Sequence, residues 1–282
     1  MSVDSAEYFE RQYNNRASIP NAQEFTDRAV ERSRAARNTL ECRLDVPYGV
    51  TSRERIDLFP ARKAGAPLFI YIHGGYWRSR SKSDFSYLAT PFVEAGLAVA
   101  LPTYDLAPQV SVEHIVRQVL AAVAWLYRNA GECNADPARI VVCGHSAGGH
   151  LSAMMVAAKW ADYASDLPPD LVKAALAISG VFDLAPLLSV SFNSEMRLDP
   201  AAVRKLSPTN YYPERAVPLH TAVGALESDE FKRQSRLIGE TWPHCRGDYM
   251  EVPGCHHLSV VEALADPGSA LHQRALGMAT GA

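Results

Sequence analysis

The chain has 282 residues, of which 48% are hydrophobic and 21% are charged, and its formal net charge at pH 7 is −3. This near balance, without long runs of either sign, argues against a nucleic-acid or anionic-membrane partner. The apolar stretches are too short to span a bilayer. The five scattered cysteines lack Cys-x-x-Cys spacing, and no signal-peptide pattern begins the chain, so we expect a cytoplasmic protein without disulfides.

Strand-like and helix-like segments alternate along the chain. The predicted strands are 55–60, 67–73, 97–104, 139–144, 171–180, 217–226 and 248–254. The predicted helices are 81–96, 111–128, 148–161 and 230–242. Such alternation predicts βαβ crossovers and a mainly parallel sheet with helices on both faces. We therefore expect one α/β domain over residues 1–282.

Two segments interrupt this alternation. Residues 1–40 are polar and helix-prone and precede the first predicted strand. Residues 182–215 form a connection that is too long for a tight turn. Because ligands of α/β sheets bind at the carboxyl ends of the strands, we interpret the first segment as a cap or arm and the second as a pocket wall.

The stretch Gly144-His145-Ser146-Ala147-Gly148 has the pattern Gly-x-Ser-x-Gly between a predicted strand and a predicted helix. A nucleophilic serine on a sharp turn requires small residues two positions away on either side. The start of the following helix would also favour negative charge on a reacting oxygen. Ser146 is therefore the candidate nucleophile.

The stretch IHGGYW, residues 72–77, ends a predicted strand. Glycines there allow backbone N–H groups to approach an oxyanion. We expect the oxyanion hole to consist of the N–H groups of Gly75, Tyr76 and Ala147, with Gly74 allowing the turn. His73 is expected to hold this loop by hydrogen bonds.

A nucleophilic serine needs a histidine base and a carboxylate that orients it, in the chain order serine, acid, histidine. Glu227 ends the next-to-last strand and is preferred as the acid, with Asp229 as the alternative. His257 precedes an apolar helical segment and is preferred as the base over His256. The remaining histidines lack metal-ligand spacing, so neither a metal nor a cofactor is expected.

Several of these stretches together resemble the kynurenine formamidase (arylformamidase) branch of the α/β-hydrolases, which is related to the hormone-sensitive-lipase-like esterases. They include HGGYW, GHSAGGHL, SGVFDLAPL, ESDEFKRQS and HHLSVVEAL, and the resemblance covers about residues 40–265. It implies an eight-stranded α/β-hydrolase fold with Ser146, Glu227 and His257 as the catalytic triad. The family usually has aspartate where this chain has Glu227, and phenylalanine where it has Leu258.

These features predict a serine hydrolase that cleaves a small acyl group from an aryl amide or ester, N-formylkynurenine being the substrate that the resemblance suggests. An aromatic leaving group could contact several aromatic residues, and Trp77, Phe182, Phe192, Tyr211 and Tyr212 are the candidates. The alternatives are a general carboxylesterase, a metal-dependent amidase and a non-catalytic ligand-binding protein. A homodimer is compatible with the sequence.

Overall fold

The structure, a computed structural model, describes residues 3–281. Eight strands form one sheet in the order β1-β2-β4-β3-β5-β6-β7-β8, and β2 pairs antiparallel with β1 and β4 while the other neighbours pair in parallel. The strands are β1 (Arg43–Pro47), β2 (Arg55–Phe59), β3 (Ala66–Ile72), β4 (Ala98–Pro102), β5 (Ala135–His145), β6 (Val172–Ile178), β7 (Leu219–Gly224) and β8 (Arg246–Val252). The prediction of a mainly parallel eight-stranded sheet is confirmed.

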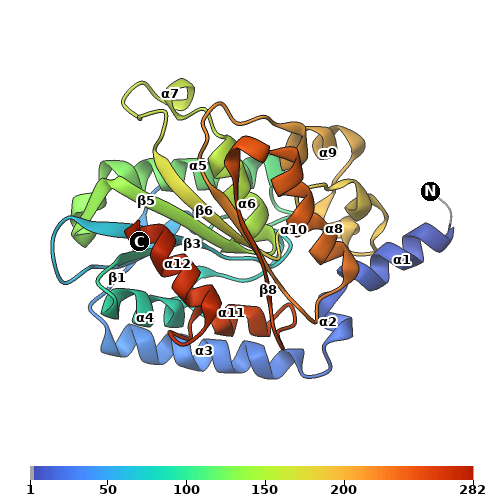
Figure 1. The fold of residues 1–282 in the computed structure, drawn as a ribbon, viewed down its shortest axis with the longest axis horizontal. Coiled ribbons are helices and arrows are strands. Elements are labelled where there is room, and N and C mark those ends of the chain that lie inside the picture. Colours follow the sequence, from blue (N-terminus) through green and yellow to red (C-terminus); the bar gives the residue numbers. More distant parts are fainter. Residues whose placement is uncertain (1–2, 282) are drawn as a thin grey trace.

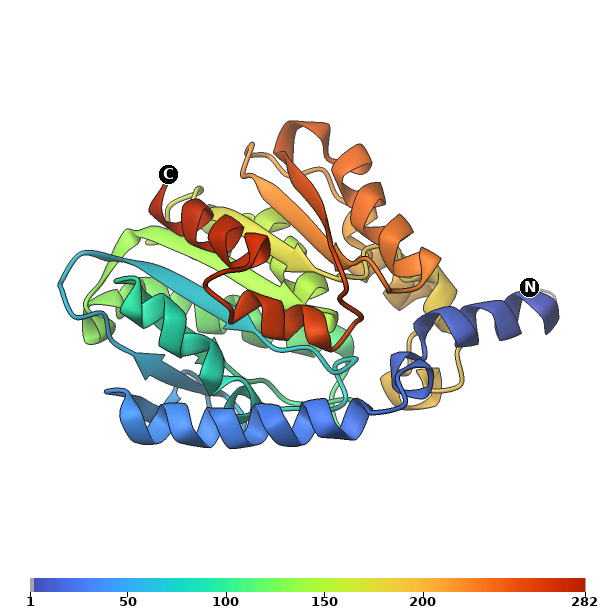
Figure 2. The same cartoon turned by 60° about the horizontal axis from the view of Figure 1, so that its bottom comes forward.

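Helices cover both faces of this sheet (Figures 1 and 2). The α-helices are α1 (Val3–Tyr13), α2 (Asn15–Ser18), α3 (Ala22–Thr39), α4 (Ala89–Glu94), α5 (Val112–Arg128), α6 (Ala147–Ala157), α7 (Trp160–Tyr163), α8 (Asn193–Met196), α9 (Pro200–Leu206), α10 (Asp229–Thr241), α11 (Ser259–Leu264) and α12 (Ala270–Thr280). The 3₁₀ turns are η1 (Lys82–Asp84), η2 (Ser86–Leu88), η3 (Ala130–Cys133), η4 (Ala185–Ser189), η5 (Pro208–Asn210) and η6 (Pro243–Cys245). Within residues 3–281, no helix combines the length and apolar character needed to cross a membrane.

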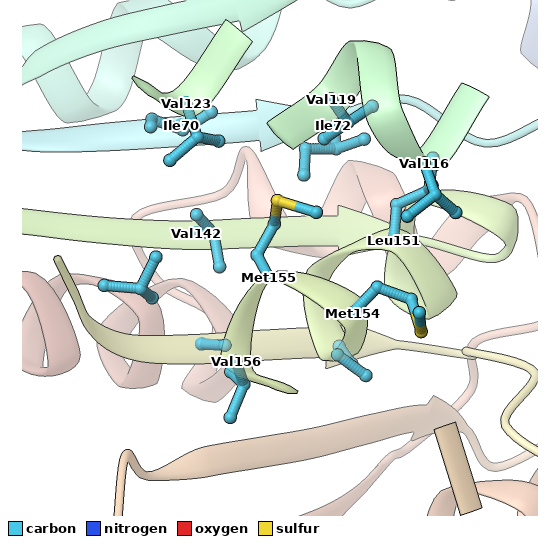
Figure 3. Close-up of a cluster of buried hydrophobic side chains, with 14 of the residues drawn as sticks. Ile70, Ile72, Val116, Val119, Val123, Val142, Leu151, Met154, Met155 and Val156 are labelled. Carbon is cyan, nitrogen blue, oxygen red and sulfur yellow. The ribbon is translucent and has the colours of Figure 1, made fainter. Parts of the chain in front are cut away.

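The central strand β3 is buried on both faces, as its nearly continuous apolar sequence predicts. Alternate side chains of a strand point to opposite faces, so Leu68 and Ile70 belong to one core cluster and Phe69 to the other. Figure 3 shows the first cluster, where residues of β3 and β5 meet the apolar faces of α5 and α6. This packing sets the end of β5, and hence Ser146, in a rigid framework.

The predicted helix over 81–96 is wrong in its first half. The structure has two 3₁₀ turns, η1 and η2, and the α-helix begins only at Ala89. The buried ammonium of Lys82 contacts the carboxylates of Asp57 and Asp45, at 2.6 and 2.7 Å, which draws the chain toward β2. Pro91 lies in the first turn of α4, where its missing N–H costs no hydrogen bond.

The two interrupting segments meet each other at one side of the sheet. Helix α1 packs against η4 and α10. The Glu10 carboxylate accepts hydrogen bonds from the backbone N–H and the hydroxyl of Ser191, at 2.7 and 2.9 Å. Figure 2 shows α1 projecting beside the short helices of the 182–215 segment, while α3 runs along the edge of the molecule. The N-terminal segment is thus fixed to the rest of the domain.

Candidate active site

Ser146 lies on the sharp turn between β5 and α6. Its backbone has φ 58° and ψ −119°, a conformation that costs energy for a residue with a side chain. The turn is held by the Ser146 N–H, which donates to the carbonyl of Ile178 at 2.8 Å. The strained turn that the Gly-x-Ser-x-Gly pattern predicts is therefore present at Ser146.

The two flanking glycines are required by close backbone contacts. A Cβ atom added at Gly144 would lie 2.1 Å from the carbonyl oxygen of Gly148, and one added at Gly148 would lie 2.0 Å from that of Ile72. Real Cβ atoms do not approach backbone oxygens so closely. The turn brings α6 against the end of β3, and only glycine fits at the contact.

We expect Gly148→Ala to lower the free energy of unfolding by about 1–3 kcal/mol, because the backbone of α6 must move away from β3. Urea unfolding followed by circular dichroism measures this change. The matched control is Gly131→Ala, because a Cβ atom at Gly131 would meet nothing within 4 Å. Equal free energies of unfolding for the two variants would contradict the steric requirement for glycine at this turn.

Glu227 and His257 form a buried hydrogen-bonded pair. His257 Nδ1 lies 2.6 Å from Glu227 Oε2, and the two side chains are 6% and 1% exposed. The other carboxylate oxygen, Oε1, accepts from the Ser179 hydroxyl at 2.6 Å and from the Gly224 N–H at 2.7 Å. A carboxylate with these partners holds the imidazole in one orientation and one tautomer.

The two alternative residues lie elsewhere. Asp229, the alternative acid, is exposed in the first turn of α10, and the carboxylate bonded to His257 is that of Glu227. The ring of His256 packs edge-on against Phe25, with centroids 4.8 Å apart. Its Nδ1 accepts the N–H groups of Leu258 and Ser259, both at 3.2 Å. The geometry thus favours Glu227 and His257 over Asp229 and His256.

Ser146 and His257 both line one cavity of about 190 Å³. In the described chain, no hydrogen bond joins their side chains, and the Ser146 hydroxyl has no protein partner. Contacts between a nucleophile and its base are often long before substrate binds and shorten in the complex. His257 therefore faces the same space as Ser146, with its Nδ1 already held by Glu227.

The predicted oxyanion loop has an unusual backbone. Gly75, Tyr76 and Trp77 all have positive φ, at 104°, 50° and 56°. Within residues 3–281, the N–H groups of Gly75, Tyr76 and Ala147 have no hydrogen-bond acceptor. Such free donors near a nucleophile suit an oxyanion hole. The Tyr76 hydroxyl secures the loop by donating to the carbonyl of Tyr13 at 2.7 Å.

His73 fixes the strand end before this loop, as the sequence predicts. Its ring contacts the Gly74 carbonyl at 2.9 Å and the Thr103 hydroxyl at 3.0 Å, and it stacks on Tyr104 with centroids 4.2 Å apart. Complete burial lowers the pKa of His73 to about 3. His73 is therefore neutral near pH 7 and acts as a structural residue.

Two predicted substrate contacts are not on the wall of this cavity. Trp77 and Phe182 are fully buried and do not line the cavity. The left-handed backbone at Trp77 turns its indole inward against the edge of His150, with centroids 5.0 Å apart. Tyr211 and Tyr212 are also absent from the cavity wall, and Tyr212 is 70% exposed. Of the predicted aromatic contacts, Phe192 lines the cavity as expected.

Sequence reasoning did not identify which residues of the N-terminal segment line the cavity. Tyr13, Phe25 and other residues between positions 13 and 29 line it. The buried Tyr13 hydroxyl donates to Glu230 at 2.7 Å, and its ring packs edge-on against Phe231, which in turn contacts the His257 ring. The expected cap over 1–40 thus forms part of the pocket, whereas the 182–215 segment supplies Phe192 alone.

His145, the residue directly before Ser146, also borders the cavity. Its ring lies against that of His257, with centroids 4.5 Å apart. Burial lowers the pKa of His145 well below its usual range, and the neighbouring His257 lowers it further. His145 is therefore neutral near pH 7 and packs as an uncharged ring against His257.

Known proteins match this chain over most of its length. The BD-FAE family matches residues 56–225. Kynurenine formamidase from Salmo salar is 31% identical over 88% of this chain and 85% of the relative. Esterase LipQ from Mycobacterium tuberculosis is 27% identical over 84% of the chain and 64% of the relative. The crystal structure of a candidate thioesterase from a Silicibacter species has a TM-score of 0.83 and 32% identity, and covers 96% of this chain and 98% of that chain.

The sheet order, together with a serine on a sharp turn between β5 and α6, defines an α/β-hydrolase. The solved structure with a TM-score of 0.83 has the same fold. The chain belongs to the kynurenine formamidase-like family of α/β-hydrolases. The predicted family and enzyme class are confirmed: the protein is a hydrolase that acts on amides or esters.

Proposed function

We propose that the protein hydrolyses its substrate through an acyl-enzyme, with Ser146 as nucleophile, His257 as base and Glu227 as the orienting acid. The observation that carries this proposal is the buried Glu227–His257 pair opening into the cavity that Ser146 lines. His257 takes the hydroxyl proton of Ser146 as the oxygen attacks the carbonyl carbon, and then gives this proton to the leaving amine or alcohol.

In the second step, water attacks the acyl-enzyme while His257 accepts a proton from it. His257 then returns this proton to the Ser146 oxygen as the acyl–oxygen bond breaks and the acid product leaves. The N–H groups of Gly75, Tyr76 and Ala147 hold the oxyanion in both steps. They are free to do so, because they have no acceptor among the described residues. No cofactor enters this scheme.

We further propose that the substrate is an aryl amide or ester with a small acyl group, and that N-formyl-L-kynurenine is the first compound to test. The cavity wall is rich in aromatic side chains, which suit an aromatic leaving group: Tyr13, Phe25, Tyr76, Phe85, Tyr87 and Phe192. The relative from Salmo salar is a kynurenine formamidase. We also propose a cytoplasmic location, since all five cysteines are free thiols.

The test compares kcat/KM for N-formyl-L-kynurenine and for a short aryl acetate ester, both with EDTA present. We expect a preference of roughly 100-fold or more for the formamide, or about 2.7 kcal/mol of differential transition-state binding. Ester turnover without formamide turnover would favour the second candidate, a general carboxylesterase, which the 27% identity to esterase LipQ supports. Loss of activity with EDTA would contradict the serine mechanism.

A further inference from the structure

The wall of the active-site cavity carries more positive than negative charge once its ion pairs are counted. Its charged residues are Arg16, Arg78, Arg80, Asp84 and Glu262. The Arg78 guanidinium pairs with Glu195, and Glu262 pairs with Arg28 at 2.8 Å. The Asp84 carboxylate accepts the backbone N–H of Ser81 at 3.2 Å. Among the residues that the structure describes, the two wall arginines without a carboxylate partner are Arg16 and Arg80.

Arg16 is exposed and contacts Gln23 at 3.1 Å, whereas Arg80 is half-buried. The Arg80 side chain donates from Nη2 to the Thr26 hydroxyl at 2.8 Å. Within residues 3–281, no carboxylate lies within 4.0 Å of its guanidinium. A half-buried arginine has lost part of its hydration, so a cation left unpaired in a cavity favours an anionic ligand.

The backbone holds Arg80 beside the oxyanion loop. Arg80 has φ 76°, a left-handed conformation that is costly for a residue with a long side chain. The Arg53 guanidinium stabilises this turn by donating to the Arg80 carbonyl at 2.7 Å. A Cβ atom placed on Gly75 would lie 3.0 Å from Arg80 Cγ, so the side-chain stem packs directly against the loop.

The positive charge of Arg80 affects groups at the end of the cavity where Ser146 lies. Burial is the main cause of the lowered pKa of His145 and of His73, and the Arg80 charge lowers both further. His145 directly precedes Ser146, and His73 ends the strand before the oxyanion loop. Arg80 therefore lies within electrostatic reach of a bound substrate, between the loop and Thr26 of α3.

We infer that Arg80 binds a carboxylate on the leaving group and so selects aryl amides or esters that carry such an anion. This inference rests on the proposed function, because it assumes that substrate occupies the cavity at Ser146. It makes Arg80 a specificity-determining residue. A guanidinium offers two parallel N–H donors to a carboxylate, and the donor used by Thr26 leaves others free.

The test uses two esters of matched size, para-acetoxyphenylacetate and its neutral counterpart para-acetoxyphenylacetamide. We expect the intact enzyme to prefer the anionic ester by roughly tenfold in kcat/KM, mainly through a lower KM, as for a charge-assisted hydrogen bond. In Arg80→Gln, the ratio of kcat/KM for the anionic ester to that for the neutral ester is expected to fall close to one. In Arg80→Lys, part of the preference for the anionic ester is expected to remain. The control is Arg204→Gln, which removes an exposed arginine of α9 that lies outside the cavity and has no ion pair within residues 3–281.

Binding of both esters to the Ser146→Ala protein, with and without Arg80→Gln, measures the same preference without turnover. A ratio near one in the unmodified protein, or an unchanged ratio in Arg80→Gln, would overturn the inference. If Arg80→Gln fails to fold, the ratio of kcat/KM for the anionic ester to that for the neutral ester is measured in Arg80→Lys. A reduced ratio that falls further at high salt would support the inference, and an unchanged ratio would overturn it. A binding preference for the anionic ester without any ester turnover would support the Arg80 site and refute the proposed function. Ester turnover without a preference for the anionic ester would support the proposed function and refute the Arg80 site.

Discussion

Replacing Ser146 with alanine is expected to lower kcat by at least roughly 10³-fold, or about 4 kcal/mol of transition-state stabilisation. The substitution removes the atom that forms the acyl-enzyme. It leaves the backbone turn in place, because the turn is held by the Ser146 N–H bond to Ile178 and by the flanking glycines. The hydroxyl itself has no hydrogen bond within residues 3–281, so the free energy of unfolding should change little.

Steady-state kinetics on the better of the two test substrates measures this loss, and thermal unfolding checks the fold. An aryl phosphonate provides an independent readout, because it should add covalently to the unmodified protein and not to Ser146→Ala, which mass spectrometry detects. The matched control is Ser194→Ala, which removes an exposed hydroxyl bonded to the carbonyl of Ser191. Near-native turnover by Ser146→Ala would remove Ser146 from the mechanism.

Replacing Glu227 with glutamine is expected to lower kcat by roughly 10²- to 10⁴-fold. The carboxylate accepts three hydrogen bonds, from His257, Ser179 and the Gly224 N–H. Glutamine keeps the shape but replaces one acceptor oxygen by an NH₂ donor. If that donor faces His257, the imidazole must adopt the other tautomer, and its Nε2 can no longer accept the proton of Ser146.

Asp229→Asn is the matched control for this prediction, because it makes the same chemical change at the alternative acid. Asp229 is exposed, so the kcat of the Asp229→Asn variant should stay within about twofold of the kcat of the unmodified protein. The ratio of the two variants therefore distinguishes the two carboxylates in one experiment. A large loss in Asp229→Asn with an active Glu227→Gln would assign the acid to Asp229 instead.

Much of the fold and part of the site could be predicted from the sequence because these features depend on local requirements. Strands buried on both faces must be apolar over their whole length, as β3 is. A serine at a strained turn needs glycines on either side, and the Cβ positions at Gly144 and Gly148 confirm the need. Chain order placed Glu227 and His257 after β7 and β8, where they meet.

The residues that line the pocket could not be predicted, because the lining depends on whether each side chain points into the cavity or into the core. Trp77 is next to the oxyanion loop in sequence, yet its left-handed backbone turns the indole into the core. Phe182 is also fully buried, because its ring packs over Gly180. Aromatic residues near a site are equally suited to a core and to a pocket, and the sequence pattern alone does not separate the two.

The sequence by itself determined seven of the eight strands, all but β1, together with the sharp turn at Ser146 and the chain order of the proposed acid and base. The tertiary structure decided that residues 13–29 of the N-terminal segment form one wall of the pocket, and that Arg80 has no carboxylate partner within the described chain. The physical reason is the range of the interactions involved. Backbone conformation and strand burial are set by neighbouring residues, whereas a pocket wall and an unpaired charge arise from elements distant in sequence that pack together.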